Sequence, residues 1–217
     1  MSAPVLASGA HELFVALVNL SVTTEQVAGL AWAERVHRER PDLVRRVQGL
    51  WTDGSTIARP GAEVFVLATL GGYLEDLTPD RFIADLPAVV EQVLGGSGIA
   101  ERPFPWFPDL LELVGARVRA LHDAPARLDD YQDLLLQVWA ELSPEWRARG
   151  LATAQAEAAL FSQKLAEGAA LLDLVPQRHL IRLDWCRPVL EHFLAQGRVA
   201  VLPSYFAQGH HAWDLGG

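Results

Sequence analysis

The chain has 217 residues, of which 50% are hydrophobic and 21% are charged, and it is long enough to fold as one large domain with a full core. Its formal net charge of −9 argues against direct binding to nucleic acid, because duplex binders carry a basic stripe that neutralises phosphates. The single cysteine, Cys186, excludes a disulfide within the chain and fits a reducing cytoplasm.

The first half of the chain predicts a series of helices. Ser8 can cap a helix over residues 8–20, although partial alternation of apolar residues leaves a strand open as an alternative. Thr23 and Gln26 match a capping box ahead of a helix that reaches about residue 40, and Pro41 begins the next helix, which ends near residue 51. Further helices are predicted over residues 60–74 and 78–93.

The second half continues this pattern after an interruption. Residues 95–108 are rich in glycine and proline and form the expected internal loop or subdomain boundary of a single domain over residues 1–217. Helices follow over residues 109–122 and 125–142. Ser143 and Pro144 give the start signal of a long helix that extends toward residue 174. A last helix covers residues 180–195, where Pro188 introduces a kink or marks the first turn.

The C-terminal stretch predicts the only β structure. Two β-type runs flank a polar bend with a glycine over residues 198–215, which indicates a hairpin. The predicted fold class is therefore mainly α, with about eight or nine helices and a small C-terminal β-hairpin. Because exposed strand edges pair readily, we expect a homodimer that buries this segment. The candidate interface residues are Val199, Val201, Pro203, Tyr205 and Phe206.

Aromatic residues on apolar helical faces are candidates for a ligand pocket, since aromatic walls around a few polar groups commonly enclose small molecules. The candidate lining residues are Trp51, Trp106, Trp139 and Tyr131, and the expected ligand is small and apolar. The same aromatic residues spread through a helical core would give the same sequence pattern, so a packing role stays open.

Residues that could hold a metal ion or perform chemistry gather near the C-terminus. They are Cys186, Glu191, His192, His210, His211 and Asp214. Zinc accepts these residue types, but the usual ligand spacings are missing, and the adjacent His210 and His211 would point to opposite faces of a strand. Cys186 could also act as a nucleophile beside His179 or His192, although a buried structural cysteine fits better. We therefore expect no catalytic residues, no metal and no cofactor.

The segment Leu202-Pro203-Ser204-Tyr205-Phe206 resembles the end of the helical domain of large bacterial transcription regulators of the ArsR type. That domain typically closes with a Val/Leu-Pro-Ser-x-Phe segment and a strand with a short apolar, acidic turn, to which residues 212–215 are similar. The apolar residues 11–20 are similar to a helix near its start. The resemblance implies a helical sensor or dimerisation domain. It departs from the family because those regulators continue into a DNA-binding winged helix where this chain ends.

Three classes of function follow from these patterns. The leading hypothesis is a non-enzymatic regulatory, sensor or dimerisation domain that binds a small ligand or a protein partner in the cytoplasm. Because of its negative net charge, we expect it to bind no nucleic acid by itself. We also expect it to bind no membrane, because its longest largely apolar run, residues 13–20, is far too short to cross a bilayer. The alternatives are a small metal-assisted enzyme or metal sensor that uses Cys186, His192 and His210, and a structural helical scaffold.

Overall fold

The computed structural model describes residues 5–27, 30–51, 60–95, 108–169, 174, 199–206 and 212–215. The described residues are mainly helical, and their β structure is limited to a small hairpin, which confirms the predicted fold class. The chain divides into two compact units, one of residues 8–144 and one of residues 1–7 with 145–217. Residues 96–107, which make up most of the segment where the sequence predicts a subdomain boundary, lie outside the described part.

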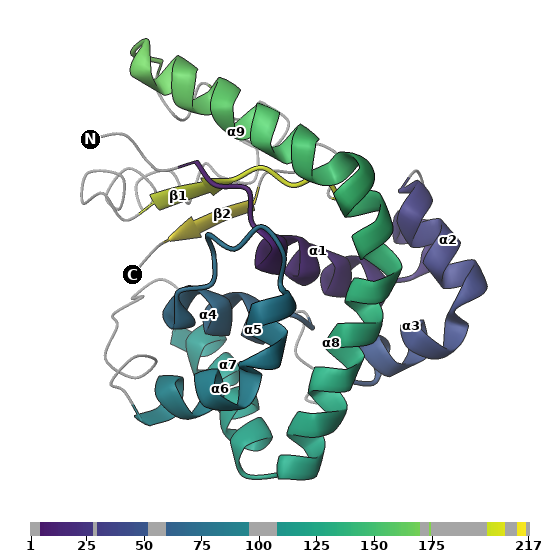
Figure 1. Ribbon diagram of the computed structural model, residues 1–217. Helices are drawn as coiled ribbons and strands as arrows, with labels where there is room; N and C mark the ends of the chain where they lie inside the picture. Colours follow the sequence, from purple (N-terminus) through teal and green to yellow (C-terminus); the bar gives the residue numbers. More distant parts are fainter. Residues whose placement is uncertain are drawn as a thin grey trace. The chain divides into compact units, whose positions relative to one another are not determined.

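The larger unit is a helical bundle (Figure 1). Its helices are α1 (Gly9–Ser21), α2 (Ala31–Glu39), α3 (Pro41–Gln48), α4 (Ala62–Gly71), α5 (Asp80–Ala84), α6 (Leu86–Gly95), α7 (Pro108–His122) and α8 (Pro125–Glu145). Helix α4 packs against α1, α6 and α7. Its sequence after the first turn is almost entirely apolar, as expected for a helix with neighbours on several sides. Helices α7 and α8 run antiparallel and are joined by Asp123 and Ala124 (Figure 1).

Helix α1 begins where the sequence predicts. The Ser8 side chain accepts a hydrogen bond from the backbone N–H of His11 at 3.2 Å, which satisfies one of the free donors at the start of the helix. Leu13, Leu17 and Leu20 are all buried, and their spacing places them on one helical face. The strand alternative for this segment is therefore excluded.

Residues 78–93, predicted as one helix, form two helices in the structure. Helix α5 ends at Ala84 and α6 begins at Leu86. Pro87 has no N–H group, so it cannot donate to the carbonyl of Ile83, the bond that a continuous helix would need. The side-chain amide of Gln132 donates to that carbonyl instead, at 2.6 Å. The proline thus explains the break, and α8 supplies the replacement hydrogen bond.

Residues 23–40 are also divided, into a 3-10 turn (Thr24–Val27) and α2. The predicted capping box is half present. The backbone N–H of Thr23 donates to Gln26 Oε1 at 3.1 Å, but the Thr23 hydroxyl also donates to that oxygen, at 3.3 Å, and does not accept a backbone bond there. The glutamine therefore closes the local turn, and the helix proper begins only at Ala31.

The predicted helix start at Ser143 is wrong, because α8 continues through Pro144 to Glu145. A π-helical turn (Trp146–Gly150) follows directly, and α9 (Leu151–Ala166) comes after it. Proline inside a helix removes a backbone donor and disturbs the regular ladder of hydrogen bonds. A proline that is typical of a helix start in the sequence is here an interior residue.

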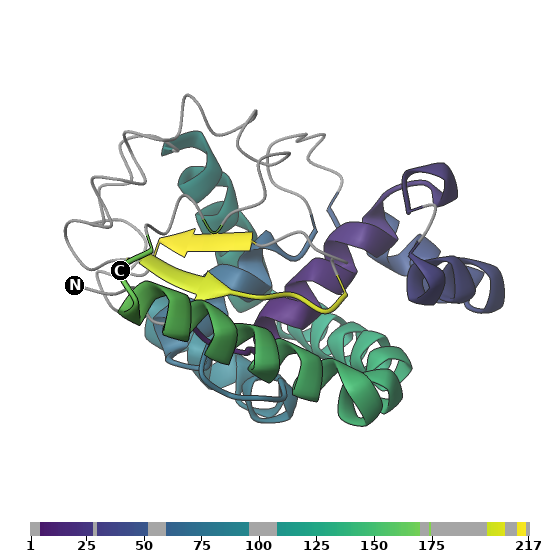
Figure 2. The ribbon, with the colours of Figure 1, turned by 90° about the horizontal axis from the view of Figure 1, so that it is seen from above.

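The smaller unit contains the hairpin of β1 (Val199–Leu202) and β2 (Ala212–Leu215), which are antiparallel with Val201 opposite Trp213. On its other side, Val201 forms a parallel bridge with Val5, and its carbonyl accepts from the backbone N–H of Leu6 at 2.9 Å. Strand β1 therefore lies between β2 and the N-terminal segment. Figure 2 shows α9 running beside the hairpin.

Candidate functional site

A carboxylate lies at the centre of the larger unit. Glu63, in the first turn of α4, has no exposed surface and accepts four hydrogen bonds. Its Oε1 accepts from Trp51 Nε1 at 2.9 Å, from the Tyr131 hydroxyl at 2.7 Å and from the Gly61 backbone N–H at 3.1 Å. Its Oε2 accepts from Arg117 at 3.4 Å. All four partners are donors, which fits an ionised, acceptor-only side chain.

The chain reaches this arrangement through local backbone geometry. Gly61 precedes α4 with φ of +99°, a left-handed conformation that side chains with a Cβ rarely adopt. A Cβ at this position would lie 2.9 Å from Leu17 Cβ. Glycine therefore permits both the backbone turn and the close approach to α1, and it points its N–H group at Glu63. The positive end of the α4 dipole adds to the stabilisation of the negative charge.

Two arginines lie over the indole of Trp51. The guanidinium carbon of Arg117 is 5.1 Å from the ring centroid and that of Arg127 is 4.6 Å from it. Arg117 is 3% exposed and forms an ion pair with Glu63. Arg127 is exposed and donates to the backbone carbonyl of Leu50 at 3.4 Å. Trp51 thus connects the buried ion pair with an arginine at the surface through cation–π contacts.

Tyr131 links the same cluster to a surface pocket. Burial, with the neighbouring negative charge of Glu63, raises the pKa of the Tyr131 hydroxyl well above its usual value of 10. The hydroxyl therefore stays protonated and donates to Glu63 at neutral pH. The ring lies 6.3 Å from the ring of Trp51 and forms part of the pocket lining.

The pocket has a volume of about 490 Å³, within the range of small-molecule sites. It is lined by Arg45, Arg46, Gly49, Leu50, Leu121, Arg127, Asp130, Tyr131 and Leu134. Leu121, Tyr131 and Leu134 are at most 2% exposed, so they lie beneath the surface of the pocket, and Leu50 is the apolar lining side chain that is partly exposed. The charged residues are exposed, and with three arginines and one aspartate the rim is net positive on a chain whose formal net charge is −9.

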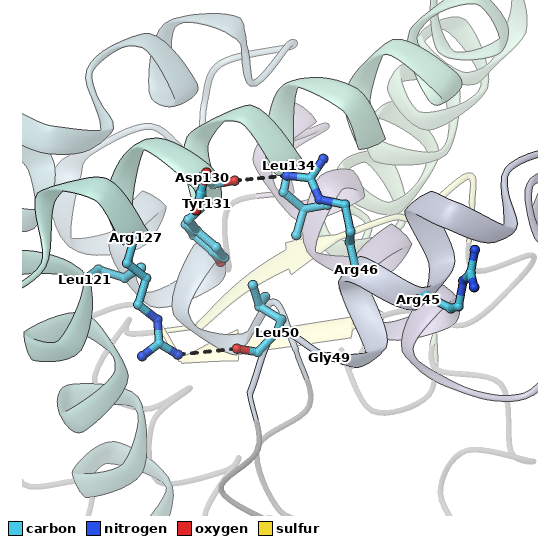
Figure 3. A pocket seen from close by; sticks show the side chains of 9 residues that line it. All are labelled: Arg45, Arg46, Gly49, Leu50, Leu121, Arg127, Asp130, Tyr131 and Leu134. Carbon is cyan, nitrogen blue, oxygen red and sulfur yellow. Dashed lines mark hydrogen bonds between the residues drawn. The ribbon is translucent and has the colours of Figure 1, made fainter.

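Two of the arginines reach across the pocket from opposite elements (Figure 3). Arg46 extends from α3 and donates to the backbone carbonyl of Asp130 at 3.4 Å and to the carboxylate of Asp133 at 3.1 Å. Arg127 extends from α8 to Leu50, which follows α3. The side chain of Leu50 points toward Tyr131 between these two contacts (Figure 3). The two arginines therefore border an apolar surface at its two ends.

The four residues predicted to line a pocket have different positions. Tyr131 lines the pocket just described, and Trp51 contacts both Tyr131 and the pocket residue Arg127. Trp139 is buried on α8 and does not line this pocket. Trp106 lies outside the described residues.

The predicted interface residues lie in and after β1. Val201, Pro203 and Phe206 are buried in the single chain, and Tyr205 is half-buried with its hydroxyl donating to Glu145 at 3.0 Å. The side chain of Val199 is outside the described part. Since both edges of Val201 are paired within the chain, this strand offers no free edge at that residue.

The residues predicted as possible metal ligands or nucleophiles lie outside the described residues or, for Asp214, have no described side chain. They are Cys186, Glu191, His192, His210, His211, Asp214 and His179. Within the described ranges, no three His, Cys, Asp or Glu side chains are arranged to hold a metal ion.

The sequence analysis missed Glu63 and Arg117. Arg117 occupies a core position of α7, three residues after Val114 and four before Leu121, both fully buried. A charged residue at such a position signals a buried partner, because an unpaired charge is rarely buried. Glu63 follows Gly61 at the start of an apolar helix, where acidic residues are common, so its burial leaves no clear signal in the sequence.

No protein-family model, no curated protein and no solved structure matches this chain. The ArsR-type resemblance therefore stays a prediction from the sequence. Among the described helices, none combines the length and the apolar character needed to cross a membrane.

Proposed function

We propose that this chain is a non-enzymatic sensor or regulatory domain, similar to the helical core of an ArsR-type regulator, which binds a small ligand in the pocket between the end of α3 and α8. The observation that carries the proposal is a pocket of about 490 Å³ that combines the half-buried side chain of Leu50 with two bordering guanidinium groups. Ligand sites combine apolar surface with a few well-placed polar groups.

The chemistry of the lining supports binding over a reaction. Arginine keeps its proton at any physiological pH, so the three guanidinium groups can hold a charged ligand but do not exchange protons with it. The Tyr131 hydroxyl donates its hydrogen bond to Glu63, and its own pKa is raised. General acid–base catalysis favours groups with a pKa near the working pH, and the raised pKa of Tyr131 does not meet this requirement.

The fluorescent probe 1-anilinonaphthalene-8-sulfonate tests the location of binding. We expect one molecule to bind per chain and its affinity to fall at least about tenfold in Leu50→Trp, because the larger side chain would fill the pocket. Leu136→Trp makes the same change at a side chain on α8 that is 50% exposed and lies outside the lining, so it should bind as the unchanged protein does. Equal binding to both variants, or none to the unchanged protein, would contradict the proposal.

Dimerisation is the second part of the proposal and is supported by the ArsR-type resemblance and the β-hairpin. Strand β1 pairs on both sides at Val201, whereas β2 pairs only with β1 among the described residues. A second copy would therefore add to β2. Light scattering should give twice the mass of one chain, and a monomer at all protein concentrations would refute this part while leaving the ligand proposal intact.

A further inference from the structure

We infer that a second copy of this chain docks on the exposed face of α9, with the two helices antiparallel and Arg149 of each copy beside Glu167 of the other. The inference rests on the dimerisation in the proposed function and adds α9 to the surface through which two copies associate. It is independent of the ligand pocket, which lies in the larger unit.

Helix α9 leaves most of its surface exposed. Its buried residues are Ala154 and Ala158, and Leu160 is 47% exposed. Glu157 and Lys164 are the charged residues between Leu151 and Ala166, although the solvent face of a helix usually carries many charges. The cores of protein–protein interfaces are depleted in charged residues in the same way. The composition of α9 therefore suits contact with a protein, and the charges at its two ends indicate which one.

One line of residues runs along the exposed side of the helix. Thr153 Oγ1 donates to the carbonyl of Arg149 at 3.0 Å, and Gln163 Nε2 donates to the carboxylate of Glu167 at 2.8 Å. Each of these pairs is therefore stacked one helical turn apart, at the two ends of the line. The line consists, in chain order, of the exposed residues Arg149, Thr153, Ala156, Leu160, Gln163 and Glu167.

The two ends of this line carry opposite charges. Arg149 and Glu167 are about 27 Å apart along the helical axis, and the members of the line between them are uncharged. Among the described residues, neither takes part in an ion pair. Two such helices placed in parallel would bring like charges together. Placed antiparallel, they bring opposite charges together at both ends, so the face is electrostatically complementary to a second copy of itself.

The uncharged residues of the line are complementary in size and polarity. When Arg149 lies beside the partner's Glu167, the helical spacing places Ala156 beside the partner's Leu160. A small side chain then faces a large one, which lets the two helices interdigitate. Thr153 faces the partner's Gln163, and both have side chains that can donate and accept hydrogen bonds. Each contact occurs twice, because a twofold axis relates the two copies.

Exchanging the charges tests this pairing. Arg149→Glu and Glu167→Arg should each weaken the dimer at least about tenfold, because like charges then meet at both ends. Combining the two substitutions should restore the dissociation constant to near that of the unchanged chain. Within one chain the two side chains are about 27 Å apart, well beyond the screening length of about 10 Å, so such a rescue can arise only between two copies.

Sedimentation velocity of the full chain, over about a hundredfold range of protein concentration, gives the dissociation constants. The contact is one helix wide and smaller than a standard specific interface, so the dimer should dissociate on dilution. Leu160→Glu places a charge at the centre of the contact and should also weaken the dimer at least about tenfold.

Two matched variants serve as controls. Arg119→Glu makes the same charge change at an exposed position on α7, and Leu136→Glu makes the same change as Leu160→Glu at a leucine on α8 that is 50% exposed. Both should dimerise as the unchanged chain does. Every substituted side chain is exposed, so the circular dichroism spectra should match that of the unchanged chain.

The outcomes separate the inference from the proposed function. A dimer that Arg149→Glu leaves unchanged, or a double variant that dimerises no better than either single variant, would overturn the inference and leave dimerisation through β2 standing. A monomer at every concentration would overturn both and leave the α9 face to a different protein. In each case the ligand pocket is judged separately, by Leu50→Trp.

Discussion

Glu63 is the centre of a buried hydrogen-bond cluster in the larger unit. Four donors converge on its buried carboxylate, and one of them is the buried Arg117. Breaking a buried ion pair leaves an uncompensated charge, which costs far more than the pair itself contributes. The same carboxylate holds Trp51 and Tyr131 through hydrogen bonds. It therefore fixes the position of the pocket residue Tyr131, although Glu63 itself does not line the pocket.

Removing one partner of this pair should be costly, and removing both should cost less than the sum. We expect Glu63→Met or Arg117→Met alone to lower the free energy of unfolding by about 3 kcal/mol or more. In the double variant, neither charge is left alone, so the loss should fall short of additivity by about 1 kcal/mol or more. Urea unfolding of the four proteins measures this. Strict additivity would show that the two side chains do not interact.

Tyr131 makes the stability of the protein depend on pH in the alkaline range. Its pKa in the folded chain is raised well above the usual 10, so the folded state retains this proton where the unfolded chain loses it. The stabilisation is therefore complete below about pH 10 and is lost as the pH rises above that value. The free energy of unfolding should fall as the pH rises above about 10, and less so in Tyr131→Phe.

Tyr73 and Tyr205 also have raised pKa values, because each is partly desolvated and donates to an acidic side chain. They also lower the free energy of unfolding as the pH rises. Tyr131→Phe should therefore reduce the loss of stability at alkaline pH but not abolish it. At neutral pH the same variant should cost about 1 kcal/mol for the lost hydrogen bond. An alkaline loss identical to that of the unchanged protein would contradict the assigned direction of the pKa shift.

At the scale of elements, the junction of α1 and α4 depends on Gly61. Alanine there would meet both an unfavourable left-handed φ and Leu17 Cβ at 2.9 Å. Gly72, at the other end of α4, has φ of +81°, but no atom lies within 4 Å of the place that its Cβ would occupy. Comparison of the two sites therefore separates backbone strain from steric overlap.

We expect Gly72→Ala to cost about 1 kcal/mol from strain alone. Gly61→Ala should cost about 1–3 kcal/mol more, because overpacking adds to the same strain. Thermal and urea unfolding give both values. Equal losses at the two sites would mean that α1 and α4 do not approach each other as closely as the structure has them.

The π-helical turn of the smaller unit is a second sterically defined junction. A Cβ on Gly150 would lie 2.5 Å from Trp146 Cε3 and 3.0 Å from Tyr205 Cδ1. Gly150→Ala should therefore destabilise the protein by about 1–3 kcal/mol. Gly95→Ala is the control, since that glycine ends α6 with nothing within 4 Å, and alanine there should be neutral or slightly stabilising. A neutral Gly150→Ala would count against the packing of Tyr205 on this turn.

At the scale of the whole molecule, local signals predict elements well and tertiary partners poorly. The Ser8 cap and the spacing of Leu13, Leu17 and Leu20 predict α1 from the sequence, and the structure excludes the strand that the partial alternation of apolar residues had left open. The helix start predicted at Ser143 and Pro144 is wrong, because α8 continues through Pro144. A serine followed by a proline looks the same in the sequence at a helix start and inside a helix, and only the structure of the preceding residues distinguishes the two.

Only part of the candidate site can be predicted from the sequence. Tyr131 and Trp51 are identifiable as aromatic residues on helical faces, but the arginines that give the pocket its charge look like those of any solvated helix face. Arg46 and Arg127 come from helices separated by most of the larger unit in sequence, and only the fold brings them to one pocket.

The central claim is that the pocket beside Leu50 and Tyr131 binds a small ligand. Backbone amide chemical shifts, followed by NMR during titration with 1-anilinonaphthalene-8-sulfonate, test it most directly. The claim predicts that the largest shifts fall on Gly49, Leu50 and the α8 residues 127–134, and that they saturate at one probe per chain. Shifts that avoid these residues, or that spread over the whole chain without saturation, would contradict it.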